Sequence, residues 1–281
     1  MSYLKIKSYA KINLALNVVG KNSSLHRTES IVSFLNLHDE ILIKSIKNKD
    51  HKIKFVGKFS NNIDLNNTVS NLLKIIDSKK LLKGKKFKII IKKNIPSESG
   101  LGGGSINAAR ILKYFIKKKL IKLPKKKIHK ICNLVGSDVI LGMYSSNLIL
   151  RSNSTIKLTS LRRNIHVLVV KPVFGCSTKK IYSKVKRFTK TQFNRPSKKM
   201  FNFNFLKNMN NDLELIAINE YPKLNSLKNF LEKLNKVEFV RMTGSGSAII
   251  AYFKTSKVCK EAEIKVKKKF KNYWCKSAKT I

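Results

Sequence analysis

A glycine-rich stretch is the part of this sequence whose residue types most clearly suggest chemistry. It reads Pro-Ser-Glu-Ser-Gly-Leu-Gly-Gly-Gly-Ser-Ile-Asn over residues 96–107 and holds four of the chain's 12 glycines. Backbone without a Cβ can adopt positive φ angles and approach phosphate oxygens closely. No Lys-Ser or Lys-Thr pair follows, as a Walker A loop requires, and Ser105 stands where the dinucleotide fingerprint has glycine. We interpret the stretch as a phosphate-binding loop of another type.

The segments on either side of this glycine loop predict that it leads into a helix. Residues 87–95 are rich in β-branched side chains and stop at Pro96, which is typical of a strand entering a turn. Apolar residues then recur at helical spacing, with Ser105 or Asn107 as N-cap and Pro124 just past the end. A strand, a loop and a helix N-terminus in this order suit an anion. The alternative is an ordinary glycine-rich turn.

Two polar residues near the N-terminus share one face of a predicted strand. Residues 6–18 alternate in polarity, and side chains two apart in a strand point the same way, so Lys11 and Asn13 lie together. The alternative is an ordinary solvated strand face. His26 lies in a polar bend before the apolar residues 31–35 and is either a ligand contact or an incidental loop residue.

Asp138 is an acidic residue in an apolar run of a chain that has only 15 Asp and Glu. It follows a predicted helix with Ile128, Ile131, Cys132 and Val135 on one face, ending at Gly136. Asp138 either caps a helix or is a carboxylate held in a site. Another helix is predicted from a cap at Asn67 to near Gly84.

Composition bounds the class of protein. The 281 residues are 42% hydrophobic, which is enough for a packed core in one or two domains. No apolar run approaches the roughly 20 residues of a membrane span. The N-terminus resembles no signal peptide, so we expect a cytoplasmic protein. The four cysteines form no Cys-x-x-Cys pair, so we predict reduced thiols rather than a zinc site or disulfides.

The net charge of +45 is the largest departure from an average composition. Such a charge can indicate nucleic-acid binding. However, only 8 of the 60 basic residues are Arg, and the lysines are scattered over almost every segment. Proteins that read nucleic acids usually enrich Arg and gather charge on one face. We therefore expect no specific nucleic-acid partner, and nucleic-acid binding remains the less favoured alternative.

The second half of the chain also mixes strands and helices. A strand is predicted at residues 166–171, helices at 212–219 and 224–234, and a final helix at 258–270. Between them lies a strand, turn and strand over 238–253, with Gly244-Ser245-Gly246 in the turn. This pattern predicts an α+β protein with domains 1–155 and 156–281.

Five motifs together resemble the GHMP kinase superfamily. In chain order they are Ala10-Lys11-Ile12-Asn13-Leu14, Leu25-His26, residues 96–107, Gly136-Ser137-Asp138-Val139 and Arg241-Met242-Thr243-Gly244-Ser245-Gly246. The first two resemble the members that phosphorylate a diphosphocytidyl sugar alcohol. The resemblance implies a two-domain fold. Its N-terminal, ATP-binding domain would be like domain 2 of ribosomal protein S5, its C-terminal domain would be ferredoxin-like, and the active site would lie between them.

The same resemblance implies the roles of individual residues. Lys11 and Asp138 would be the catalytic pair. Asn67 would lie near the base of ATP, and the phosphates would be covered by Pro96, Ser97, Glu98, Ser99, Gly100, Leu101, Gly102, Gly103, Gly104, Ser105 and Ile106. The sugar-alcohol substrate would contact Asn13, His26, Tyr182, Gly244, Ser245 and Gly246. Mg²⁺ is expected with ATP, with Ser105 as the nearest loop hydroxyl. The partners would be these small molecules and no membrane, and the protein would be a monomer or weak homodimer.

The sequence departs from the superfamily pattern at three places. Ser97-Glu98-Ser99 replaces glycines, so the Glu98 carboxylate must point away from bound phosphates. Leu25 replaces a tyrosine, which removes an aromatic face for cytosine. Ile140 stands where a proline is usual. The Leu25 change leaves open another small-molecule kinase of the superfamily, acting on mevalonate, homoserine or a sugar.

Overall fold

The computed structural model describes residues 2–22, 25–61, 63–144, 146–159 and 164–281. The chain folds into two compact units, and each is built from several separate segments. The first unit comprises Met1–Ala10, Leu37–Ser97 and Gly102–Ser145, and the second comprises Lys11–Asn36, Glu98–Leu101 and Ser146–Ile281. Strands β1 (Leu4–Lys21) and β2 (His26–Ile46) pair with each other, and each contributes to both units. The split at residue 155 stays a prediction.

The sheet of the first unit contains β4 (Lys86–Lys92), the strand predicted before the glycine loop. It pairs in parallel with β3 (Lys52–Val56) and antiparallel with residues 40–46 of β2. Phe87, Ile89 and Ile91 are buried while their neighbours are not, as the period of two in a strand requires. The prediction of a strand here is confirmed.

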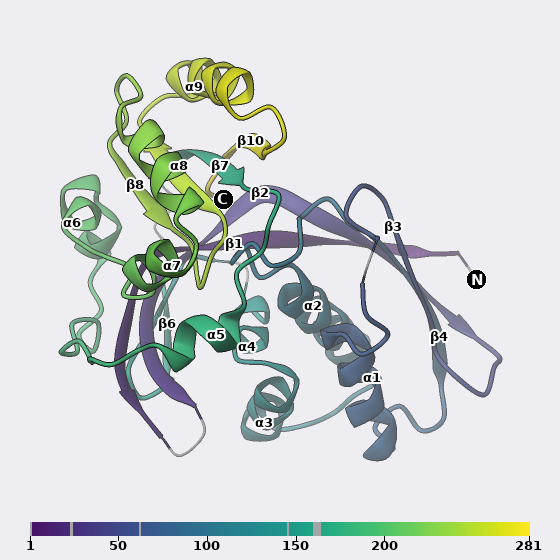
Figure 1. Cartoon of the computed structure of the whole chain (residues 1–281). Coiled ribbons are helices and arrows are strands. Elements are labelled where there is room, and N and C mark those ends of the chain that lie inside the picture. Colours follow the sequence, from purple (N-terminus) through teal and green to yellow (C-terminus); the bar gives the residue numbers. More distant parts are fainter. Residues whose placement is uncertain (1, 23–24, 62, 145, 160–163) are drawn as a thin grey trace. The chain divides into compact units, whose positions relative to one another are not determined.

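Four helices of the first unit pack on one another, namely α1 (Thr68–Ser78), α2 (Gly103–Lys117), α3 (Lys125–Val135) and α4 (Val139–Gly142) (Figure 1). The predicted cap of α1 is confirmed, because the Asn67 side chain accepts the N–H groups of Val69 and Ser70. The predicted cap of α2 is wrong. The N-cap is Gly102, in the left-handed region at φ 71°, because the chain turns into the helix before it reaches Ser105.

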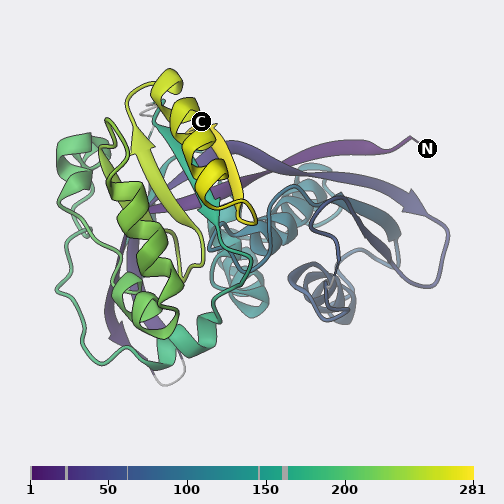
Figure 2. The ribbon, with the colours of Figure 1, turned by 45° about the horizontal axis from the view of Figure 1, so that its top comes forward.

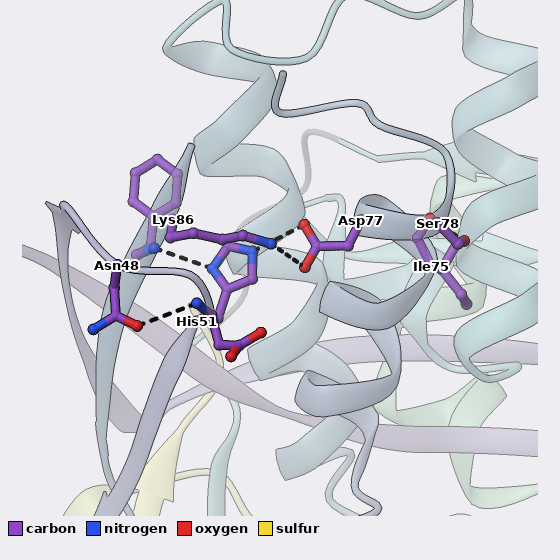
Figure 3. Close-up of polar contacts among 8 residues, drawn as sticks. Asn48, His51, Ile75, Asp77, Ser78 and Lys86 are labelled. Carbon is purple, nitrogen blue, oxygen red and sulfur yellow. Dashed lines mark hydrogen bonds and ion pairs between the residues drawn. The ribbon is translucent and has the colours of Figure 1, made fainter. Parts of the chain in front are cut away.

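A polar cluster ties the end of α1 to β4 and to the start of β3 (Figure 3). Asp77 accepts from Lys86 Nζ at 2.7 Å and pairs with His51 Nε2 at 3.3 Å. The other ring nitrogen of His51 accepts the N–H of Phe87 at 3.1 Å. Because that nitrogen is an acceptor, the imidazole is neutral, and burial lowers the pKa of His51.

The second unit contains an antiparallel sheet in the order β10-β7-β9-β8. Its strands are β7 (His166–Lys171), β8 (Phe239–Met242), β9 (Ile249–Phe253) and β10 (Trp274–Lys279). Helices α8 (Lys223–Glu232) and α9 (Ser256–Lys269) pack on it side by side (Figure 2). Strand, helix, two strands, helix and strand in this order make the ferredoxin-like arrangement, which the resemblance implied.

Shorter elements complete the second unit. Its other strands are β5 (Leu148–Leu150), paired with residues 30–32 of β2, and β6 (Ile156–Leu158), paired with β5. Its other helices are α5 (Thr178–Ser183), a 3-10 helix (Lys198–Phe201), α6 (Phe203–Lys207) and α7 (Glu214–Glu220). The buried Arg241 guanidinium donates to the carbonyl oxygens of Leu14, Leu206 and Met209. Arg241 therefore holds β1 and the end of α6 to β8.

The four cysteines are all buried and form no disulfide. Burial raises the pKa of Cys132 and of Cys176 to about 11 and that of Cys275 to about 12. Among the helices of the described residues, none is long and apolar enough to cross a membrane.

Candidate active site

Lys11 and Asn13 lie inside the second unit and not on a solvated strand face. Their residues are 2% and 3% exposed, and Lys11 Nζ donates to Asn13 Oδ1 at 2.6 Å. Asn13 Nδ2 in turn donates to Ser30 Oγ at 2.8 Å. Burying an ammonium group is costly unless polar partners surround it, so this arrangement is not that of a surface-filling lysine.

The turn over residues 243–247 closes beside this lysine. Thr243 Oγ1 accepts the backbone N–H of Asn13 at 3.0 Å. Asn211 Nδ2 donates to the carbonyl oxygens of Met242 and Gly244, both at 2.8 Å. A Cβ placed on Gly244 would lie 3.2 Å from Gly100 Cα and 3.4 Å from Lys11 Nζ, and its φ of 56° also favours glycine. The backbone angle and the close approach to Gly100 therefore favour glycine at this position, which lies beside Lys11.

The first half of the glycine loop, residues 98–101, packs on the same turn. Ser247 and Ala248 donate their N–H groups to the carbonyl oxygens of Glu98 (3.1 Å) and Ser99 (3.2 Å). The N–H of Lys11 donates to Leu101 O at 3.0 Å. Gly100 has φ 71°, and a Cβ there would overlap the carbonyl oxygen of Thr243. Sequence reasoning treated the two glycine motifs separately, whereas in the fold they are direct neighbours.

Glu98 is the one acidic residue of the glycine loop, and its side chain packs against Gly175. A Cβ at Gly175 would overlap the Glu98 carboxylate, so only glycine leaves room for it. The neighbouring Lys171 is buried and donates from Nζ to the carbonyl oxygens of Pro172 (3.0 Å) and Phe174 (2.9 Å). Burial lowers the pKa of Lys171, and the negative charge of Glu98 opposes that shift. The Glu98 carboxylate thus packs against Gly175 and lies near the Lys171 ammonium group, both in the second unit.

The second half of the loop, from Gly102 onward, belongs to the first unit and begins α2. Its N-cap residue, Gly102, has no side chain to cap the first N–H groups of the helix. A Cβ on Gly103 would lie 3.2 Å from Lys93 Nζ, and one on Gly104 would lie 2.9 Å from Thr68 Oγ1. The start of α2 therefore combines uncapped backbone donors, a helix dipole and a buried lysine, which together favour an anion.

Asp39 is a buried residue of this region that sequence reasoning missed. Its Oδ1 accepts the N–H groups of Asn94 (2.7 Å) and Ile95 (2.9 Å), just before the loop. Its Oδ2 accepts from Asn107 Nδ2 at 2.9 Å and from Lys93 Nζ. Asp39 therefore joins the segment before the loop to the helix after it. In the sequence, Asp39 lies a few residues after the apolar stretch 31–35, and no motif marks it.

Asp138 lies in the first unit, at the residue before α4. Its side chain makes no capping hydrogen bond to that helix, so the interpretation of Asp138 as a helix cap is not supported. Gly136, two residues earlier, lies against Ser105, because a Cβ there would be 3.9 Å from Ser105 Oγ. The segment that carries Asp138 thus runs past the hydroxyl of the glycine loop.

The side-chain amide of Asn67 is occupied by the start of α1. Its Oδ1 accepts from Val69 and Ser70, and its Nδ2 donates to Asp64 O at 2.8 Å. A role near the base of ATP remains a prediction.

His26 and Tyr182, 156 residues apart in sequence, meet in the second unit. Their ring centroids are 5.2 Å apart at 40°, and Phe188, which sequence reasoning missed, lies 6.4 Å from His26. Burial and the charge of Lys21 lower the pKa of His26, so the ring is neutral at pH 7. Ser245 Oγ is hydrogen-bonded to Thr178 Oγ1, at the start of the helix that carries Tyr182, at 2.8 Å.

Comparisons with known proteins identify the family. Residues 67–147 match the GHMP kinases N terminal domain and residues 191–272 match the GHMP kinases C terminal model. The chain is 56% identical over 281 residues to the 4-diphosphocytidyl-2-C-methyl-D-erythritol kinase of Pelagibacter ubique, covering all of both chains. It is 32% identical to the kinase of that name from Clostridium tetani, over 99% of this chain and 100% of that one.

Solved structures share the fold at low identity. A crystal structure of 4-(cytidine 5'-diphospho)-2C-methyl-D-erythritol kinase superposes with a TM-score of 0.76 at 19% identity, covering 98% of this chain and 99% of that one. Homoserine kinase from Cytophaga hutchinsonii gives 0.72 at 14% identity, covering 100% and 95%. The chain belongs to the GHMP kinases and, within them, to the 4-diphosphocytidyl-2-C-methyl-D-erythritol kinase family.

Proposed function

We propose that this chain transfers the γ-phosphoryl group of ATP to the 2-hydroxyl of 4-diphosphocytidyl-2-C-methyl-D-erythritol, in the non-mevalonate route to isoprenoid precursors. The observation that carries the proposal is the full-length identity of 56% to a kinase of that name. It is supported by Lys11, a buried ammonium group held by Asn13 beside Gly244. It is also supported by the start of α2, where uncapped donors favour phosphate.

The proposed chemistry needs a group that orients the alcohol and a cation that offsets negative charge. Phosphoryl transfer usually passes through a loose transition state, so positioning matters more than full prior deprotonation of the alcohol. In the proposal, Asp138 orients the hydroxyl and accepts its proton as the oxygen–phosphorus bond forms. The Lys11 ammonium group stabilises the negative charge that develops on the attacking oxygen.

Mg²⁺ is proposed to accompany ATP. In the described part of the chain, no three His, Cys, Asp or Glu side chains gather as an all-protein metal site would need. Mg²⁺ bound with a nucleotide commonly takes one or two protein oxygens, with phosphates and waters completing its coordination. The Ser105 hydroxyl is an oxygen donor of that kind, at the start of α2. When bound, the ion would neutralise phosphate charge.

The small molecules are proposed to be the specific partners of the chain, without a specific nucleic acid. A substrate panel tests the proposed reaction. The purified protein is incubated with ATP, Mg²⁺ and one of four acceptors: the diphosphocytidyl alcohol, mevalonate, homoserine or galactose. Phosphorus NMR should show a new phosphomonoester resonance and ADP only with the diphosphocytidyl alcohol. Turnover of another acceptor in its place would overturn the proposed substrate while keeping the kinase activity.

A further inference from the structure

Glu98 has a backbone angle that favours glycine. Its φ is 48°, in the left-handed region, where the Cβ of an ordinary residue comes too close to a carbonyl oxygen. The other described non-glycine residues with positive φ lie in turns that follow a helix or join two strands, namely Lys80, Lys83, Lys119, Ser154 and Lys236. Glu98 instead lies in the glycine loop, where glycine would remove the strain. Such strain persists only where surrounding contacts hold the residue.

The main chain of Glu98 is held by the turn over residues 243–248. Ser247 donates its N–H to Glu98 O at 3.1 Å. The Ser247 hydroxyl donates to Phe174 O at 2.7 Å. Phe174 belongs to residues 172–175, which follow β7 and are called here the 172–175 segment. Ser247 therefore joins the glycine loop, the turn and the 172–175 segment.

The side chain of Glu98 packs against the same 172–175 segment. A Cβ built on Gly175 would lie 2.0 Å from Glu98 Oε2 and 2.5 Å from Glu98 Cβ. The carboxylate and the base of the side chain thus both occupy space that a side chain at residue 175 would fill. The main chain and the side chain of Glu98 therefore contact two different segments of the second unit, and removal of the side chain would leave only the main-chain contact.

A buried cation lies near this carboxylate. Lys171 is 8% exposed, and its Nζ donates to Pro172 O at 3.0 Å and to Phe174 O at 2.9 Å. Both acceptors belong to the 172–175 segment, so the ammonium group is fixed where the Glu98 side chain packs. A carboxylate in a loop that covers phosphates would repel them, and a nearby cation reduces this repulsion.

We propose that Glu98 is a positioning residue for phosphoryl transfer, and that Lys171 offsets its charge. The side chain, packed against Gly175, holds residues 98–101 at the turn, and Leu101 O in this stretch accepts the N–H of Lys11 at 3.0 Å. Glu98 acts through the position of the loop and not by contact with the reacting atoms. The inference rests on the proposed function, because it concerns a loop that is proposed to cover the ATP phosphates.

The first test removes the Glu98 side chain and relieves the backbone strain at the same time. Glu98→Gly should lower kcat about 10- to 100-fold, because a small displacement of active-site groups costs rates of this order. The melting temperature should change little, because relief of strain opposes the lost contact. Lys236→Gly is the matched control: this exposed residue of the second unit has φ 55°, and its variant should keep the wild-type kcat. A wild-type kcat in Glu98→Gly would overturn the inference.

A second test displaces the carboxylate from the other side of the contact. The Cβ of Gly175→Ala would overlap the Glu98 carboxylate, so this variant should lower kcat as Glu98→Gly does. In the double variant there is no carboxylate to displace, so kcat should be no lower than in Glu98→Gly alone. Losses that multiply would contradict the proposed contact, because the two residues would then act separately.

The third test isolates the charge. Lys171→Met leaves the carboxylate without its cation and should raise the Kd for ATP with Mg²⁺ about five- to tenfold, measured by calorimetric titration without turnover. Adding Glu98→Gln should return the Kd towards wild type, because a neutral amide of the same shape does not repel phosphate. Loss of the Lys171 hydrogen bonds alone would not be reversed in this way, so an unreversed Kd would overturn the role of Lys171.

Failure of the inference and failure of the proposed function give different results. A wild-type chain that binds no ATP would overturn both. Transfer from ATP to a different alcohol would overturn only the proposed substrate, and the same variants would then be compared with that alcohol. Normal wild-type turnover with unchanged kcat in Glu98→Gly and Gly175→Ala would overturn only the inference.

Discussion

The two halves of the glycine loop are held in different ways. Residues 98–101 are fixed by main-chain hydrogen bonds to the turn at 243–248 and by close contact between Gly100 and Thr243. The region around Gly102–Asn107 is fixed by charge, because the buried Asp39 binds Lys93 and Asn107. The position of the first half therefore depends on a glycine that leaves room for the turn. The position of the second half depends on the ion pair between Asp39 and Lys93.

The proposed catalytic residues divide in the same way. The N–H of Lys11 donates to Leu101 O, so Lys11 is attached to the first half of the loop. Asp138 belongs to the unit of the second half, in the segment where Gly136 lies against Ser105. A substitution that destabilises one half of the loop should thus displace mainly the proposed catalytic residue in the same unit.

The largest effect is expected from the two proposed catalytic residues themselves. Asp138→Asn should lower kcat about 10²- to 10⁴-fold, the usual contribution of general acid–base catalysis. Lys11→Met should cost about 10²- to 10³-fold, because a preorganised charge is lost. The double variant should be little worse than the poorer single variant, because residues that act as a unit are not additive. Steady-state kinetics and circular dichroism check both rate and fold. Losses that multiply fully would show that the two residues act independently.

Substitution of two aspartates of the first unit tests how much the ion pair of Asp39 stabilises the second half of the loop. Asp39→Asn should lower the free energy of unfolding by about 3–5 kcal/mol, because it leaves the Lys93 ammonium group buried and unpaired. Asp77→Asn removes a partly exposed pair with Lys86 and should cost about 0–1 kcal/mol. Urea denaturation measures both. Adding Lys93→Met to Asp39→Asn should recover part of the loss, and equal losses in the two single variants would argue against a special role for the buried pair.

Substitution of two glycines with similar backbone angles tests how much the close packing of Gly100 stabilises the first half of the loop. Gly100 (φ 71°) and Gly84 (φ 78°) are both left-handed, but only at Gly100 would a Cβ overlap another residue. Gly100→Ala should cost about 2–4 kcal/mol, from left-handed strain plus overpacking against Thr243. Gly84→Ala should cost only about 1–2 kcal/mol, because strain is its sole term. Thermal unfolding compares them. A Gly100→Ala protein as stable as Gly84→Ala would show that the turn at Thr243 can move away.

The smallest effect is a pH dependence at His51, away from both halves of the loop. Its pKa in the folded protein is lowered by burial, with Lys86 acting in the same direction and Asp77 opposing it. The unfolded chain therefore binds a proton first as pH falls below about 6.5, so stability is full above that pH and declines as pH falls through the folded-state pKa. His51→Gln should have a shallower decline between pH 7.5 and 5.5 than wild type in urea denaturation. Parallel curves would exclude His51 as a contributor.

Much of the fold could be predicted from periodic patterns. The strand before the glycine loop, α1 with its Asn67 cap and the strand pair around Gly244 follow local rules of spacing and capping. β4 was recognised from its β-branched residues, whereas its alternating burial appears only in the structure. β3, β5, β6 and β10 were not predicted, because short strands are stabilised mainly by their partners and carry little signal of their own.

The sequence was enough to select candidate site residues, but it did not predict which residues from distant segments contact one another. Lys11 and Asn13 could be placed on one face because strand geometry dictates it, and their 2.6 Å hydrogen bond agrees. The contact of Gly100 with Thr243 joins residues 143 apart, and no local pattern encodes that meeting. Asp39 and Phe188 escaped notice for the same reason, because their partners come from distant segments.

The buried cysteines allow the local opening of each unit to be followed separately by thiol labelling. With a pKa of about 11, the thiols of Cys132 and Cys176 are ionised to only about one part in a thousand at pH 8, and burial also keeps reagents away. Alkylation at these sites must therefore wait for a local opening of the structure. Cys132 lies in the first unit, whereas Cys176, Cys259 and Cys275 lie in the second. Labelling rates resolved by mass spectrometry would report how often each unit opens, and whether ATP slows one of them more than the other.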